Sequence, residues 1–99
     1  MFVVTNRVFV SPGWESQFED RFQKRAGQID KQDGFVNMYV MRPCSEETPF
    51  VVMTMWNNKE AFLNWVESED FKQSHSNPLP KEAYGKGGGM EQFDVVVSS

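Results

Sequence analysis

Hydrophobic and polar positions divide the chain into four segments with the character of β-strands. The first, Phe2 to Val10, alternates and is rich in β-branched residues. Two others, Phe35 to Met41 and Phe50 to Trp56, are apolar on both faces, and the turn-forming pair Asp33-Gly34 precedes the first of these. Met90 to Val97 is the fourth. We expect each segment to form a strand.

A helical period follows the first strand-like segment. Apolar residues recur one helical turn apart at Trp14, Phe18, Phe22, Ala26 and Ile29. Ser11 has the side chain of an N-cap, and Pro12 suits the first position of a helix. We therefore expect a helix that begins at Pro12 and runs to Ile29.

A second helical stretch follows the third strand-like segment. Asn57 and Glu60 have the spacing of a capping box. Ser68 has the character of a fresh N-cap, with acidic residues in the turn after it. Phe71 and His75 lie one turn apart and should share a face. The pattern predicts a helix with an apolar face that is broken near Ser68.

The resulting order, β-α-β-β-α-β, is typical of the ferredoxin-like split βαβ fold within the α+β class. We expect one domain over residues 1–99, with a four-stranded antiparallel sheet and helices on one of its faces. Because two strands are apolar on both sides, the other face also needs cover. A second copy of the chain would supply that cover, which predicts a homodimer.

The segment from Ser76 to Gly89 is predicted to be a flexible loop, because it contains two prolines and a Gly-Lys-Gly-Gly-Gly run. Its glycines do not form a phosphate loop. They precede a strand rather than a helix, and no Lys-Ser/Thr pair follows them.

Charge and cysteine content narrow the classes of partner. The net charge is −4 and no Lys/Arg run exists, so we expect no nucleic-acid partner. The single cysteine, Cys44, cannot form an internal disulfide. No basic leader and no apolar stretch of membrane-spanning length is visible, which favours a cytoplasmic location without a membrane partner.

The only histidine, His75, limits the possible metal chemistry. One histidine and one distant cysteine cannot build a zinc site, and a single histidine cannot form a two-histidine iron triad. No nucleophile elbow or dinucleotide fingerprint is present. A single histidine can, however, hold a haem iron as the proximal ligand and leave the sixth position open to oxygen.

Other residues fit the remaining requirements of a haem site. Aromatic side chains for its walls are available at Phe22, Trp65 and Phe71. Arg21 and Arg25 have no acidic residue one turn before them and could bind the two propionates. Asn6 is an amide on an otherwise apolar strand face and could donate a hydrogen bond on the open side of the iron.

Each of these residues also has a plain structural interpretation. Asn6 could be a buried amide bonded to a neighbouring group. Arg21 and Arg25 could be solvated or paired with acids on another element. His75 could be a surface residue at the end of an exposed helix.

The chain resembles the IsdG-like haem-degrading monooxygenases, which belong to the antibiotic-biosynthesis-monooxygenase-like, dimeric α+β-barrel superfamily. The resemblance covers nearly the whole chain. It is carried by Phe2-Val-Val-Thr-Asn6-Arg7, Arg21-Phe22 with Arg25, Asp33-Gly34-Phe35, Ala61-Phe62-Leu63-Asn64-Trp65 and Phe71-Lys-Gln-Ser-His75.

The resemblance implies a role for three residues. His75 would bind the haem iron, Asn6 would supply the hydrogen bond on its open side, and Trp65 would press on the porphyrin and ruffle it. Haem would be both substrate and cofactor, so the enzyme would need O2 and an external electron donor. The product stays open between biliverdin-like and oxo-bilirubin-like chromophores, the latter with or without loss of the bridge carbon.

Two other functions compete with this one. A cofactor-free quinol- or anthrone-type monooxygenase of the same superfamily also places Asn and Trp in its cavity, but it needs neither an iron ligand nor cations for propionates. The chain could instead be a non-catalytic haem-binding module, or a small dimeric stress protein with an empty cavity. Binding of haem and its destruction by O2 separate these functions.

Overall fold

The structure is a computed structural model that describes residues 1–25 and 28–99. Its strands are β1 (Phe2–Val8), β2 (Phe35–Met41), β3 (Phe50–Trp56) and β4 (Gly89–Asp94). Its α-helices are α1 (Glu15–Arg25), α2 (Lys59–Val66) and α3 (Glu69–Ser74). Two short 3-10 helices, η1 (Ile29–Lys31) and η2 (Lys81–Ala83), complete the order. The predicted order β-α-β-β-α-β, with the second helix broken, is confirmed.

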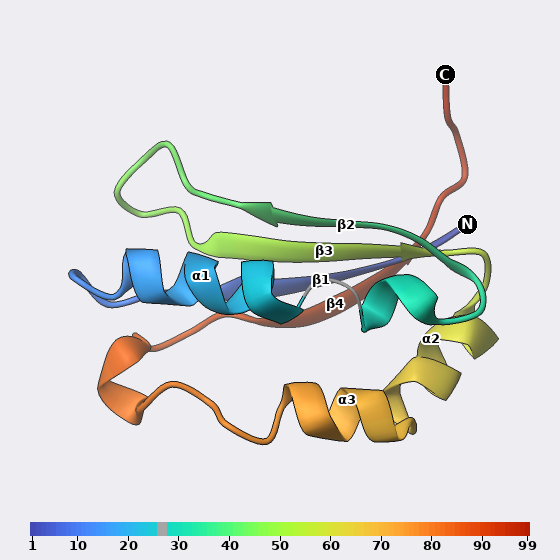
Figure 1. The fold of residues 1–99 in the computed structure, drawn as a ribbon. Helices are drawn as coiled ribbons and strands as arrows, with labels where there is room; N and C mark the ends of the chain where they lie inside the picture. The colour runs from blue at the N-terminus through green and yellow to red at the C-terminus, as the bar shows by residue number, and fades with distance from the viewer. Residues whose placement is uncertain (26–27) are drawn as a thin grey trace.

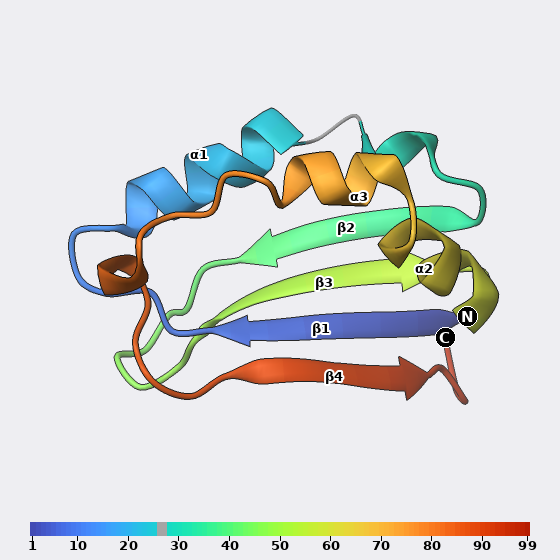
Figure 2. The same cartoon turned by 90° about the horizontal axis from the view of Figure 1, so that it is seen from below.

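The four strands form one antiparallel sheet in the order β2-β3-β1-β4. This is the ferredoxin-like arrangement. β1 is central, and its residue Asn6 lies opposite Val52 of β3 and Met90 of β4. All three α-helices lie on the same side of the sheet (Figure 1). Seen from that side, they lie toward the β2 edge of the sheet, and no helix covers β4 (Figure 2). β4 is accordingly exposed along its whole length.

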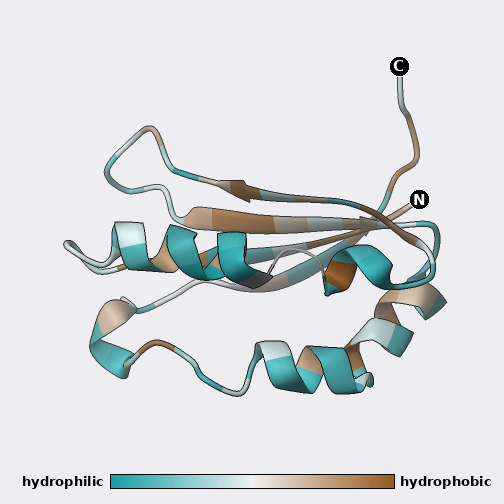
Figure 3. Cartoon of the chain, in the orientation of Figure 1, coloured by the Kyte–Doolittle hydropathy of each residue, from teal (hydrophilic) through white to brown (hydrophobic). Residues whose placement is uncertain are grey.

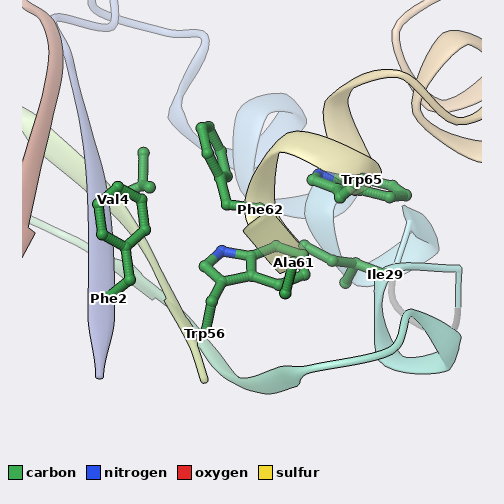
Figure 4. Close-up of a cluster of buried hydrophobic side chains, with 7 residues drawn as sticks. All are labelled: Phe2, Val4, Ile29, Trp56, Ala61, Phe62 and Trp65. Atoms are coloured by element: carbon green, nitrogen blue, oxygen red, sulfur yellow. The ribbon is translucent and has the colours of Figure 1, made fainter. Parts of the chain in front are cut away.

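The larger core cluster lies between the sheet and α2 (Figure 4). At its centre is Trp56, the last residue of β3, which is fully buried. Its ring meets Phe35 and Phe62 edge-on, with centroids 5.5 and 6.0 Å away. A smaller cluster of Phe18, Phe50 and Val52 packs α1 against β3. These contacts fix α1 and α2 relative to the central strands.

The turn before β2 fits closely against α2 at Gly34. This residue has a φ of +81°, and a Cβ atom added to it would lie 2.5 Å from the Cβ of Ala61. The carbonyl of Gly34 also accepts a hydrogen bond from the backbone N–H of Asn57. Only glycine meets both the conformational and the steric requirement here.

We expect Gly34→Ala to destabilise the fold strongly. The positive φ costs about 1–2 kcal/mol for an L-residue, and the clash with Ala61 adds roughly 1–3 kcal/mol. Gly13→Ala is the matched control, because Gly13 has a φ of +92° but no atom within 4 Å of an added Cβ. Urea unfolding should show a clearly larger decrease in the free energy of unfolding for Gly34→Ala than for Gly13→Ala. Equal losses would mean that the contact with Ala61 yields without cost.

Two predicted helix starts are wrong. α1 begins at Glu15 rather than Pro12, because Gly13 adopts a left-handed conformation and the N–H of Trp14 closes a turn onto the carbonyl of Ser11. The cap of α2 is Asn58 rather than Asn57, and its side chain accepts a hydrogen bond from the N–H of Ala61 at 2.9 Å. Glu60 is therefore not part of a capping box. The predicted cap at Ser68 is confirmed, since its hydroxyl accepts from the N–H of Phe71.

Several predicted boundaries also shift. Ile29 belongs to η1 instead of α1, and Ala26 lies outside the described residues. β1 ends at Val8, and Val10 forms an isolated bridge to Tyr84. β4 ends at Asp94, before the well-exposed Val96 and Val97, which pair with no other strand in the part of the chain that the structure describes.

The segment Ser76 to Gly89, predicted to be an irregular loop, contains η2 and is attached to the end of β1. The N–H of Ser11 donates to the carbonyl of Ala83 at 2.8 Å, and the N–H of Gly85 donates to that of Phe9 at 2.7 Å. Ala83 is fully buried. The segment is therefore the predicted loop, with a single 3-10 turn and the bridge of Tyr84 to Val10 within it. Its flexibility stays a prediction.

The face of the sheet that the helices leave open carries large apolar side chains. Tyr39, Met41 and Phe93 are each between 43% and 49% exposed. β3 and part of β2 are coloured apolar in Figure 3, whereas α1 and α3 are mostly polar. The prediction that both faces of the sheet are apolar agrees with this arrangement. Among the described residues, no helix has the length and apolar character needed to cross a membrane.

Candidate functional site

A cavity of about 560 Å³ lies between the sheet and the helices. Its volume is in the range of sites for small molecules and cofactors. The sheet contributes Asn6 to its lining. Helix α2 contributes Trp65, and α3 with its C-cap contributes Phe71 and His75. Phe22 reaches it from α1. Five of the seven residues predicted for the site thus face one cavity.

Asn6 is exposed on the cavity side of β1. The expectation of a buried amide is wrong, because β4 and the adjoining part of β1 have no helix above them. Its side chain also makes no hydrogen bond to any other described residue, which removes the interpretation of Asn6 as an amide bonded to its neighbours. Its amide N–H groups are free to donate to a bound molecule.

His75 caps the C-terminal end of α3 and is exposed at the cavity wall. Its Nδ1 lies 2.8 Å from the carbonyl oxygen of Phe71 and 3.0 Å from the hydroxyl of Ser74. A carbonyl only accepts, so Nδ1 carries a proton, and in the neutral imidazole Nε2 then keeps its lone pair. A neutral imidazole with a free Nε2 is the form that binds a metal ion.

An aromatic chain connects Trp65 to His75. The ring of Phe71 meets Trp65 edge-on at 5.4 Å, and it stacks on His75 at a centroid distance of 4.0 Å and an angle of 28°. Trp65 itself is only 7% exposed and belongs to the larger core cluster (Figure 4). The fold therefore supports Trp65 rigidly, while the imidazole is held by its immediate neighbours on α3.

The two predicted arginines have different outcomes. Arg21 is half-buried on α1 beside Phe22 but is not part of the cavity lining. Within residues 1–25 and 28–99 it forms no ion pair. The side chain of Arg25 lies outside the described residues. The proposed pair of arginines for an anion thus stays a prediction.

One ion pair near the cavity was not predicted. Arg42, after β2, binds Glu19 of α1 through two hydrogen bonds of 2.8 and 2.6 Å. These bonds lower the pKa of the Glu19 carboxyl below its usual value. The partners are 23 residues apart and on different elements, so no helical spacing could reveal them.

Several polar residues of the cavity were also missed. Thr54 on β3 and Gln92 on β4 share the cavity face with Val52 and Met90. Strand alternation could have identified both of them. Tyr84 reaches the cavity only because η2 attaches its segment to β1, and no local sequence pattern indicates that.

The cavity therefore combines apolar and aromatic walls with one available imidazole nitrogen and an unpaired amide. The described residues contain no group of three His, Cys, Asp or Glu that could hold a bare metal ion. A single nitrogen ligand inside a broad apolar cavity fits a metal that brings its own equatorial ligands. Haem is such a group.

Comparison with known proteins agrees with the fold. The antibiotic biosynthesis monooxygenase family matches residues 1–77. A haem oxygenase (staphylobilin-producing) from Staphylococcus epidermidis is 38% identical over 79 residues, which cover 78% of this chain and 75% of that enzyme. The same enzyme from a second strain of that species matches equally well.

Two solved structures are similar over the whole chain. The haem degrader MhuD from Mycobacterium tuberculosis, with two haems bound in its active site, has a TM-score of 0.81 and 26% identity, and the match covers 100% of this chain and 99% of that one. An MhuD mutant with two manganese protoporphyrin IX molecules per active site has a TM-score of 0.84 and 25% identity, with 100% and 98% covered. The resemblance to IsdG-like enzymes is confirmed, and the chain belongs to the antibiotic biosynthesis monooxygenase family.

Proposed function

We propose that this protein is a haem-degrading monooxygenase. It takes haem as its substrate, opens the porphyrin ring with O2 and electrons from an external reductant, and releases the iron. The observation that carries the proposal is the geometry of His75. Its Nδ1 is engaged by Phe71 and Ser74, its Nε2 makes no hydrogen bond to another described residue, and His75 lines the same cavity as Asn6 and Trp65. The 38% identical relative is itself a haem oxygenase.

In this proposal His75 would hold the iron through Nε2 from the helix side of the cavity, and the sheet would form the opposite wall. Bound haem iron supplies the site at which O2 is activated. Asn6 lies on the sheet wall with no other hydrogen-bond partner among the described residues. It would donate a hydrogen bond to a group on the sheet side of the bound substrate and stabilise negative charge that develops there.

Trp65 would act on the bound porphyrin by steric contact. The helix α2 holds its indole between the core and the cavity, so the ring cannot retreat when a flat molecule enters. A porphyrin pressed against it must distort, and distortion is one lever by which proteins change the electronics of a haem. Arg21 and Arg25, which flank Phe22 in the sequence of α1, would bind the two propionates.

The alternative function, a cofactor-free quinol- or anthrone-type monooxygenase, uses no iron ligand. The hydrogen bonds of His75 favour haem, because they occupy Nδ1 and leave Nε2 of this cavity-lining residue without a hydrogen bond to another described residue. Titration of the apo protein with hemin separates the two functions. We expect a Soret band that saturates with added hemin, and the absence of such a band would overturn the haem proposal.

The protein is a homodimer in this proposal. The open face of the sheet carries Tyr39, Met41 and Phe93, which alternate along their strands with cavity-facing residues such as Met38 and Gln92. A second copy that covers this face would bury these side chains. The face belongs to the sheet side opposite the cavity, so both copies keep an accessible site.

Light scattering at micromolar concentration should therefore give the mass of a dimer. Tyr39→Glu places a charge on the open face and should shift the protein toward the monomer. Tyr84→Glu is the matched control, because Tyr84 is similarly exposed but lines the cavity. A wild-type protein that is monomeric at this concentration would contradict the dimer.

The remaining partners follow from the reaction. Ring opening consumes electrons, so a reductase or a small reductant must supply them.

The exposed thiol of Cys44 has no internal partner in the sequence and suits a reducing compartment, which supports the cytoplasmic location.

A further inference from the structure

The imidazole of His75 is held by two residues of the same short helix. Phe71 contributes its ring, stacked at 4.0 Å, and its carbonyl oxygen, 2.8 Å from Nδ1. Ser74 contributes its hydroxyl oxygen, 3.0 Å from Nδ1. The hydroxyl of Ser74 also donates to the carbonyl of Phe71 at 2.9 Å. Nδ1 of His75, the hydroxyl oxygen of Ser74 and the carbonyl oxygen of Phe71 thus form one closed set of hydrogen bonds.

The hydrogen-bond directions in this set follow from the chemistry of the atoms. The hydroxyl proton of Ser74 is used on the carbonyl of Phe71, so the same oxygen can only accept from Nδ1. Nδ1–H therefore faces two acceptors, and a proton on Nε2 in place of Nδ1 would leave Nδ1 facing the carbonyl without a bond. The arrangement favours the tautomer in which Nε2 is free.

Little else holds the ring. His75 is exposed, and it follows the last residue of a helix of six residues. Outside α3, no described residue makes a hydrogen bond or a ring contact with it. A surface histidine at such a position would ordinarily change rotamer and tautomer freely, and a ligand to iron gains affinity when both are set in advance.

We infer that Ser74 is a positioning residue for the iron ligand, acting together with the carbonyl and the ring of Phe71. Its hydroxyl completes the acceptor pair for Nδ1–H and so orients Nε2 of His75 toward the substrate iron. This role rests on the proposed function. Ser76 provides a matched comparison, because its hydroxyl donates to the carbonyl of Gln73 at 2.8 Å but does not touch the imidazole.

The first test needs no haem. Because the chain has one histidine, the ¹⁵N spectrum of the neutral side chain reports His75 alone. We expect the apo wild type to show mainly the Nδ1–H tautomer, and Ser74→Ala to contain more of the Nε2–H tautomer than Ser76→Ala does. A wild-type spectrum dominated by Nε2–H, or identical spectra for the two variants, would overturn the inference.

The second test measures hemin affinity by the Soret band. Loss of an outer partner of a metal ligand costs about 10-fold or more in affinity, so Ser74→Ala should bind about 10-fold more weakly than wild type. Ser76→Ala should bind like wild type, and Ser74→Thr, which keeps the hydroxyl, should restore most of the affinity. A band that Ser74→Ala and Ser76→Ala weaken equally would overturn the positioning role alone. A wild type that forms no band at all would overturn the proposed function, while the spectra of the apo protein would still decide the role of Ser74 in holding the ring.

Discussion

Replacement of His75 by alanine is expected to abolish haem turnover and to weaken hemin binding more than any other single change in the cavity. His75 is the only histidine, it lines the cavity, and its Nε2 makes no hydrogen bond to another described residue. Since loss of an outer-shell partner alone costs about 10–100-fold in metal affinity, loss of the ligand should cost at least about 100-fold. Hemin titration and the rate of Soret bleaching under air with ascorbate measure both effects.

The fold should survive this substitution, because His75 is exposed and its hydrogen bonds and ring contact are confined to α3. Unchanged urea unfolding therefore serves as the control. Added imidazole provides a second one, since it can occupy the vacated space and restore part of the Soret band. A His75→Ala protein that turns over haem at the wild-type rate would refute the assignment of His75 as the iron ligand.

Asn6→Ala is expected to lose turnover but to keep hemin binding, unlike His75→Ala, which should lose both. The amide makes no hydrogen bond to another described residue, so its removal leaves no buried group unsatisfied. Removal of a single preorganised donor to developing negative charge reduces catalytic rates by about 10²–10³-fold, and we expect a loss of that size. Asn6→Asp, which keeps the shape but loses the amide donor, should be similarly slow.

Asn37→Ala is the matched control for this prediction. Asn37 is also an exposed asparagine within the sheet, but it is not part of the cavity lining. It should leave turnover close to wild type. If Asn6→Ala instead lowers hemin affinity as much as it lowers turnover, the amide helps to hold the substrate in its ground state and has no special role in the reaction.

The strands were predictable because their apolar runs are long and bounded by turn residues. Trp56 and Phe2 lie in such runs, and each falls in the core. The helix starts were harder to predict from the sequence. Pro12 and Asn57 are residue types that favour a helix start. At Pro12, however, the left-handed conformation of Gly13 delays the helix, and at Asn57 the backbone N–H is hydrogen-bonded to the carbonyl of Gly34. Tertiary context decided these boundaries.

The candidate site shows the same division. Asn6, Trp65 and His75 could be named from their residue types and the family resemblance, and the structure places all three around one cavity. The hydrogen bonds of His75 to Phe71 and Ser74 could not be foreseen, because they depend on the side-chain rotamer at a helix end. The same holds for the pair of Glu19 and Arg42, which only the packing of α1 beside β2 brings together.

The measurement that tests the central claim most directly is a single turnover of the hemin-loaded protein. Ascorbate is added under air, with catalase present to remove peroxide, and a ferrous chelator traps any iron released. We expect the Soret band to disappear, a tetrapyrrole product to appear by mass spectrometry, and iron to be released in a one-to-one ratio with haem. A Soret band that stays intact under these conditions would contradict the claim and leave a protein that binds haem without degrading it.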